Sequence, residues 1–265
     1  MHSGLPAAGY GISLLAMPSR DEYRVWADRQ GLHSYTVSQG ESDLYIATET
    51  DLSTMADDVL RSQRAVIAGY IRTNPGFAVS LQPIACPDGA PPIIRDMCLA
   101  ARASGVGPMA AVAGAVAEYV GRELGRFSNE VIVENGGDIY LQGKGSRTIA
   151  IYAGSSPLSG RVGIELDLRG RAAGVCTSSG TVGPSLSFGK ADAAVALAAS
   201  ATLADAAATA LGNIVKSSDD IETGLELAGK IAGVSGAVII VGDRIGAWGS
   251  VKLVRLSCPG DKPLS

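Results

Sequence analysis

The chain has 265 residues and a formal net charge of −4 at pH 7, and hydrophobic residues make up 46% of it. A chain of this length can bury a large core, either as one elaborate domain or as two small ones. Aromatic residues make up only 5% of the chain and the basic residues form no stripe, so the sequence argues against nucleic acid as a partner.

The cysteines indicate a reducing compartment. No two of them form a Cys-x-x-Cys pair, so a zinc or iron–sulfur framework is not expected, and scattered thiols are typical of reduced cytosolic proteins. The four are Cys86, Cys98, Cys176 and Cys258.

The apolar run at 11–17 is too short to cross a membrane and has no cleavage-site context. We therefore expect a soluble, cytoplasmic protein without a membrane partner.

Patterning divides the chain into a glycine-rich N-terminal segment at 1–20, a single domain at 21–258 and a flexible tail at 259–265. In the first half of the domain, period-two patterns and turn residues predict strands at 23–27, 33–38, 41–46 and 77–84, the first two joined as a hairpin. Apolar residues at helical spacing predict helices at 51–70, 93–103 and 109–120. The last of these carries no charge before Glu118, so it should be buried on nearly all sides.

The second half begins with a buried strand from Val131, which runs into a polar turn and a further strand. Later strands are expected at 148–153, 162–168, 237–241 and 251–256, with a turn at 243–246 before the last one. Helices are expected at 202–215 and at 217–232. For residues 191–198 the alanine content favours a helix and the neighbouring sequence favours a strand, and the sequence leaves this open.

The most informative stretch is the polar turn Glu134-Asn135-Gly136-Gly137-Asp138. Two adjacent glycines allow a positive φ and let another group approach the backbone closely. Asn-Gly alone can build a hairpin turn, whereas two acids, an amide and a double glycine also suit a ligand-binding loop. Both interpretations stay open.

A second candidate is the pair Asp205 and Thr209, which four-residue spacing stacks on one face of a helix made of alanine and leucine. A carboxylate and a hydroxyl are oxygen ligands of the kind that Mg²⁺ prefers. The alternative is that Thr202 and Asp205 form a capping box that only starts the helix.

A third candidate is Thr177-Ser178-Ser179-Gly180, a hydroxyl-rich segment with a permissive glycine that could cradle an anion. It is not a Walker motif, and a plain turn is the alternative. The preceding Cys176 is interpreted as a small buried hydrophobic residue rather than a nucleophile.

The order of these pieces resembles the ApbE superfamily, the FAD:protein FMN transferases. Members carry a Gly/Ala helix, an Asn-x-Gly-Gly-Asp-type loop, a Thr-Ser-Gly segment and a late Ala-Asp-Ala-x-x-Thr helix. In this chain the matching stretches are 107–120, 134–138, 177–180 and 204–209. More closely, the chain resembles an uncharacterised, soluble, ApbE-like family, over about 41–213.

The resemblance implies an α+β, T-fold-related architecture in which sheets are packed with helices and two similar halves surround a cleft. It further implies that Asp205 and Thr209 bind Mg²⁺ together with a backbone carbonyl near Ala110. The residues at 134–138 and 177–180 would then border a flavin nucleotide, FAD or FMN. Asp138 and Ser179 are the candidates for a catalytic role, which the motifs leave unassigned.

The chain also departs from the transferases. Their His-Ile-x-Asp-Pro-x-Thr-Gly stretch after Thr-Ser-Gly is missing, and residues 183–189, with Pro184, stand in its place. The flavinylation acceptor pattern and a secretion signal are missing as well. We therefore expect a Mg²⁺-dependent transferase or hydrolase acting on a flavin or related nucleotide. The alternative is a non-enzymatic flavin-binding or partner protein in anaerobic sulfur metabolism, and either reading leaves room for a homo-oligomer.

Overall fold

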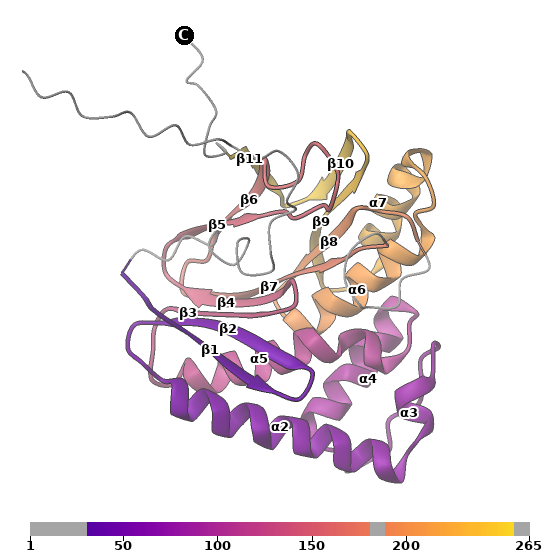
Figure 1. The fold of residues 1–265 in the computed structure, drawn as a ribbon. Coiled ribbons are helices and arrows are strands. Elements are labelled where there is room, and N and C mark those ends of the chain that lie inside the picture. The colour runs from indigo at the N-terminus through magenta and orange to yellow at the C-terminus, as the bar shows by residue number, and fades with distance from the viewer. Residues whose placement is uncertain (1–30, 181–188, 257–265) are drawn as a thin grey trace, which may run out of the picture.

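The computed structural model describes residues 31–180 and 189–256 (Figure 1). The expected strand at 23–27, the N-terminal segment at 1–20 and the tail at 259–265 lie outside the described residues, as do Pro184 and Cys258.

Eight strands form a central antiparallel sheet in the order β1-β2-β3-β4-β7-β8-β9-β10. They are β1 (His33–Gln39), β2 (Ser42–Thr48), β3 (Val131–Asn135), β4 (Asp138–Gly143), β7 (Arg171–Ser178), β8 (Ala193–Ala198), β9 (Val234–Val241) and β10 (Arg244–Gly249). A smaller sheet of three strands has the order β11-β6-β5. Its strands are β5 (Ser146–Ala150), β6 (Val162–Asp167) and β11 (Lys252–Arg255).

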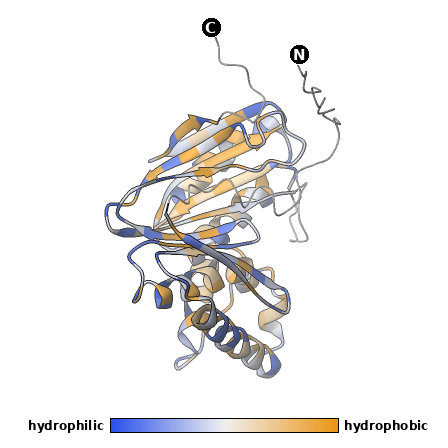
Figure 2. Cartoon of the chain, turned by 60° about the vertical axis from the view of Figure 1, so that its left-hand side comes forward, coloured by the Kyte–Doolittle hydropathy of each residue, from blue (hydrophilic) through white to orange (hydrophobic). Residues whose placement is uncertain are grey.

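The helices gather on one face of the central sheet, and β5 and β6 lie on the other side (Figure 1). The helical elements are α2 (Ser53–Thr73), α3 (Gly76–Val79), α4 (Pro92–Ser104), η2 (Pro108–Ala111), α5 (Val112–Leu124), α6 (Ala201–Ile214), η3 (Ser218–Asp220) and α7 (Ile221–Lys230). One hydrophobic core lies between the helices and the sheet, and a second lies between the sheet and the small sheet. Figure 2 shows the largely apolar strands that separate the two cores.

The topology repeats. Strands β1 and β2 are followed by helices and then by β3 and β4, and β7 and β8 are followed by helices and then by β9 and β10. The pairing of β4 with β7 joins these two units into one sheet, and β5 and β6 are inserted between them. The α+β class with two similar halves is therefore confirmed.

Strand β8 resolves the question that the sequence left open. Its alternate residues enter different cores: Ala194, Ala196 and Ala198 pack toward the helices, and the residues between them pack toward the small sheet. A central strand buried on both faces has no polar alternation, so its sequence resembles that of a buried helix. Tertiary packing overrides the helical propensity of alanine here.

Three local expectations are wrong. Residues 77–84 do not form a strand, because Phe77 donates its amide to Asn74 and packs its buried ring against Tyr70, which makes the short helix α3. The expected turn at 243–246 extends too far, since β10 already begins at Arg244. The sequence also missed β7, whose residues were interpreted as a polar, glycine-rich segment.

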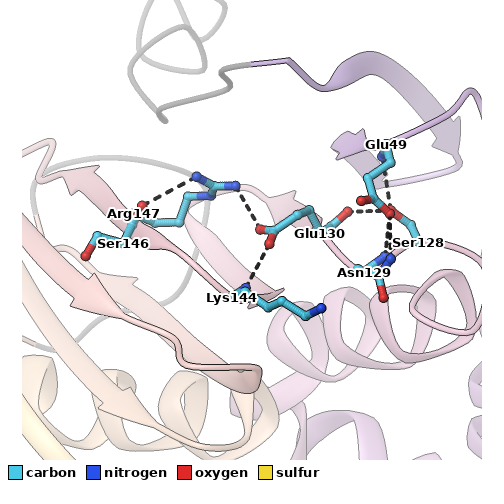
Figure 3. A network of polar contacts seen from close by, with 7 residues as sticks. All are labelled: Glu49, Ser128, Asn129, Glu130, Lys144, Ser146 and Arg147. Carbon is cyan, nitrogen blue, oxygen red and sulfur yellow. Dashed lines mark hydrogen bonds and ion pairs between the residues drawn. The ribbon is translucent and has the colours of Figure 1, made fainter.

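A polar network ties the two sheets together at the start of β3 (Figure 3). The Glu130 carboxylate accepts hydrogen bonds from the Lys144 amide at 2.8 Å and from the Arg147 guanidinium on β5 at 2.8 Å. On the neighbouring loop, Glu49 accepts from the Asn129 amide at 2.7 Å, and the Ser128 hydroxyl donates to the Glu130 carbonyl at 2.6 Å. This end of β3 is therefore fixed by one ion pair and several hydrogen bonds, whereas its other end leads into the glycine turn.

We predict that Gly137→Ala costs more than about 1 kcal/mol of unfolding free energy. Gly137 has φ 104°, and a Cβ there would meet nothing within 4 Å, so the cost is conformational and not steric. Gly136 has φ 69°, which asparagine tolerates, so Gly136→Asn is the matched control and should stay within about 0.5 kcal/mol. Urea denaturation measures both variants, and equal stability of Gly137→Ala and wild type would contradict this account.

Candidate functional site

The stretch 134–138 is a two-residue hairpin turn. Asn135 pairs with Asp138 across the turn, and both glycines have positive φ. The buried Glu134 carboxylate accepts a hydrogen bond from the Gly137 amide at 2.8 Å, which stabilises the turn. The hairpin interpretation is confirmed. Whether the turn can also bind a ligand depends on the residues that surround it.

The end of β7 lies beside this turn, because β4 pairs with β7. The Asp138 carboxylate accepts the Thr177 amide at 3.3 Å. Thr177 and Ser178 are the last residues of β7, so the plain-turn alternative is wrong for them, and the half-buried Ser179 and exposed Gly180 follow. The hydroxyl-rich segment therefore leaves the sheet at the same end as the double glycine.

The first turn of α5 completes the cluster. The Asn135 amide donates to the Ala113 carbonyl at 3.1 Å, and the Gly114 amide donates to the Asp205 carboxylate at 2.8 Å. A Cβ on Gly114 would lie 2.3 Å from the Ala201 carbonyl oxygen, so only glycine allows α5 and α6 to approach this closely. The 134–138 turn and α6 are far apart in the sequence, and both thus contact the first turn of α5.

The capping-box alternative for Asp205 is wrong. Ser200 is the N-cap of α6 and accepts the Leu203 amide, while Asp205 reaches across to α5. Thr202 instead donates its hydroxyl to Glu118 at 2.9 Å.

Glu118 is a buried residue that the sequence analysis did not place in any site. Its carboxylate accepts the Ser200 hydroxyl at 2.7 Å and the Thr202 amide at 3.0 Å, so it caps the N-terminus of α6 from α5. The sequence offered one signal for this role, because Glu118 is the first charged residue of an otherwise apolar helix.

The two aspartates are buried close enough to interact electrostatically. Burial raises the pKa of Asp205 to about 7, although hydrogen bonds from the Gly114 and Ala113 amides oppose the shift. Burial also raises the pKa of Asp138 well above its usual range, and the charge of Asp205 raises it further. Two buried acids with raised pKa values are typical of functional sites.

Cys176 is fully buried beside these acids, whose charges act on its thiol. Burial raises the pKa of its thiol well above the usual value, and the charges of Asp138 and Asp205 raise it further. The thiol donates to the Ala201 carbonyl at 3.3 Å. The interpretation of Cys176 as a small buried side chain agrees with this environment.

The residues expected to bind Mg²⁺ lie on adjoining elements. Thr209 is half-buried one helical turn beyond Asp205, and η2, which contains Ala110, packs against α6. Among residues 31–180 and 189–256, no group of three or more His, Cys, Asp and Glu side chains could hold a metal ion. The expected set differs from such a group because it has one carboxylate, one hydroxyl and one backbone carbonyl, all of them oxygen donors that suit Mg²⁺.

In the described part of the chain, no single helix has both the length and the apolar character needed to span a membrane. The bent pair of α4 and η2–α5, which meet at 105°, passes this test only when the two are taken together. Residues of both helices are buried in the helical core, as expected for core helices.

We predict that the protein loses stability as the pH rises from 5 to 8. The pKa of Asp205 is about 7 in the folded state against 3.8 for an ordinary aspartate, so the folded state binds the proton more tightly. Its stabilising contribution is complete below about pH 4 and is lost as the pH rises toward 7, which amounts to roughly 2–3 kcal/mol between pH 5 and 8. Urea titrations in EDTA measure this slope. Asp205→Asn should flatten it, and an unchanged slope in that variant would contradict the assignment.

Comparisons with known proteins identify the family and the fold of this chain. A family model described as AbpE bacteria matches residues 24–242. A UPF0280 protein of Methanosarcina acetivorans is 42% identical over 203 residues, covering 76% of this chain and 80% of the relative. A UPF0280 protein of Methanocella arvoryzae is 40% identical over 221 residues, covering 80% and 90%.

Among solved structures, the apo form of Pseudomonas stutzeri flavinyl transferase ApbE matches with a TM-score of 0.54 and 15% identity, over 82% of this chain and 94% of that one. At this identity the likeness shows the fold alone. The family model and the relatives establish more, because they match most of the chain: this protein belongs to the ApbE-like family described as AbpE bacteria.

Proposed function

We propose that the protein is a Mg²⁺-dependent enzyme that binds a flavin nucleotide and acts on its pyrophosphate as a transferase or hydrolase. The observation that carries the proposal is the convergence of the 134–138 turn, the end of β7 and the starts of α5 and α6 around two buried carboxylates. Buried like charges are costly unless a cation or a proton compensates them. A site of this kind therefore suits a ligand that brings a metal ion.

Asp205, Thr209 and the carbonyl of Ala110 would hold the Mg²⁺ ion, as the family resemblance implies. When bound, Mg²⁺ would neutralise the charge of a pyrophosphate. The donor set supports this role because it contains only oxygen atoms and lies where η2 packs against α6.

The turn residues would bind and orient the nucleotide. Gly136 is exposed and has no side chain, so a planar ring can approach the backbone there. Asn135 and Asp138 are already fixed by Ala113 and Thr177, which makes them rigid positioning groups rather than mobile ones. The segment Thr177 to Gly180 supplies three hydroxyl groups beside them, suited to line the path of the phosphates.

Asp138 and Ser179 are the candidates for contact with the reacting atoms. Asp138 is a buried acid at the glycine turn, and Ser179 is a half-buried hydroxyl next to the exposed Gly180. Either group could orient the attacking nucleophile once the nucleotide is bound.

We predict that Asp205→Asn weakens Mg²⁺ binding at least tenfold while the fold is retained, because the variant keeps an oxygen acceptor for the Gly114 amide but loses the negative charge. Isothermal titration calorimetry measures the affinity, and circular dichroism checks the fold. Asp96→Asn is the matched control, since Asp96 accepts the Tyr119 hydroxyl at 2.7 Å on α4 outside the cluster. Equal Mg²⁺ affinity in wild type and Asp205→Asn would end the metal assignment.

We predict slow cleavage of FAD to FMN and AMP rather than efficient transfer of FMN to protein. The histidine-bearing stretch of the transferases is missing from the sequence, and a positioned acid or base typically contributes 10²–10⁴-fold. Chromatography of FAD, FMN and AMP measures the reaction in the presence of Mg²⁺, with an acceptor peptide added in parallel.

The outcomes of this assay separate the candidate functions. Rapid transfer to the peptide would show that the missing stretch is not needed. Binding of FAD without any turnover would favour the non-enzymatic flavin-binding protein. An absence of FAD binding at micromolar protein would reject the flavin ligand.

A further inference from the structure

A second two-residue hairpin turn lies beside the glycine turn, at the same end of the central sheet. The turn at 40–41 joins β1 to β2 and is closed by the pairing of Gln39 with Ser42. Leu44 of β2 pairs with Asn135 of β3, and Ser42 lies two residues before Leu44 on the same side of the sheet. Since Leu44 packs into the helical core, the buried Ser42 side chain also lies on the side of the helices.

Arg64 of α2 lies against this second turn. One of its guanidinium nitrogens donates to the Ser42 hydroxyl at 2.6 Å, and a Cβ on Gly40 would lie 2.6 Å from another. The side chain is half-buried, and in the described part of the chain no carboxylate lies within ion-pair distance of it, whereas Arg61 on the same helix pairs with Asp57. Most of the five N–H donors of the Arg64 guanidinium are therefore left for another acceptor.

The charges of the proposed site call for such a cation. The turn at 134–138, the segment at 177–180 and helix α6 contain no basic residue. Two buried carboxylates, those of Asp138 and Asp205, lie among them. These acids would repel a phosphate group, so positive charge must oppose them before an anionic ligand can bind. The proposed Mg²⁺ ion would supply part of this charge at Asp205.

We propose that Arg64 binds a phosphate group of the nucleotide on the β2 side of the glycine turn. Strands β2 and β3 are neighbours and lie roughly 5 Å apart, so the guanidinium bound to Ser42 is next to this turn. A guanidinium binds phosphate through two parallel N–H···O bonds, and its planar shape favours this contact over that of a lysine. The inference rests on the proposed function for the nucleotide, and it adds a binding residue from α2 that the sequence motifs did not include.

Isothermal titration calorimetry of the full-length chain with inorganic pyrophosphate and Mg²⁺ tests the assignment. Arg64→Gln removes the charge but keeps an amide that can donate to Ser42. We expect this variant to bind pyrophosphate about tenfold more weakly than the wild type, because charge-assisted hydrogen bonds are lost. Arg61→Gln is the matched control on α2. The Arg61 side chain is 62% exposed, so the affinity should change by less than about twofold at about 0.15 M salt.

Ser42→Ala separates ligand binding from support of the turn. This variant removes the hydrogen-bond partner of Arg64 and leaves the guanidinium available to a phosphate. We expect it to lose less pyrophosphate affinity than Arg64→Gln does. If Arg64 only supported the turn, both variants would lower the melting temperature and neither would change the affinity of the folded protein for pyrophosphate.

Equal pyrophosphate affinity in the wild type and Arg64→Gln, or no pyrophosphate binding by the wild type, would overturn the proposal. Titration of the same proteins with FAD separates this result from the proposed function. Pyrophosphate binding that depends on Arg64, without any FAD binding, would support the phosphate site and reject the flavin ligand. FAD binding of equal strength in the wild type and Arg64→Gln would support the flavin ligand and reject the role of Arg64.

Discussion

The close approach of α5 and α6 at Gly114 is the constraint on which the rest of the structure depends. Without a Cβ at this position, the first turn of α5 reaches the Asp205 carboxylate, and the Asn135 side chain can hold the same turn from the sheet. Glu118 on α5 then caps the start of α6. The helices and the glycine turn are thus fixed by polar contacts between backbone and side chains, in a core that is otherwise built from small apolar residues.

This arrangement explains why polar groups can be buried in so apolar a protein. Each carboxylate has backbone amides as partners: Asp205 accepts from Gly114, Asp138 from Thr177, and Glu118 from Thr202. Buried acids are tolerated when they are hydrogen-bonded, but burial still raises the pKa values of Asp205 and Asp138. Burial of these two carboxylates in their charged form therefore destabilises the folded state, and a bound cation would offset this cost.

The sequence predicted the helices and the motifs better than the sheet. Strong periodicity and turn residues located α2, α4 and α6, and the double glycine identified the turn at 134–138. It could not decide β8, because a strand buried on both faces loses its alternation. It missed Glu118 because its partners lie more than 80 positions away, in a helix start that only the fold brings close.

The central claim is that Asp205, Thr209 and the Ala110 carbonyl bind a divalent cation beside a flavin nucleotide. Anomalous diffraction from crystals grown with Mn²⁺ and FAD tests it most directly, because it locates the ion independently of turnover. The account predicts a peak about 2.0–2.3 Å from the Asp205 carboxylate, with the FAD pyrophosphate as a further ligand. A nucleotide bound at the glycine turn with no ion at Asp205, or an ion elsewhere in the protein, would contradict it.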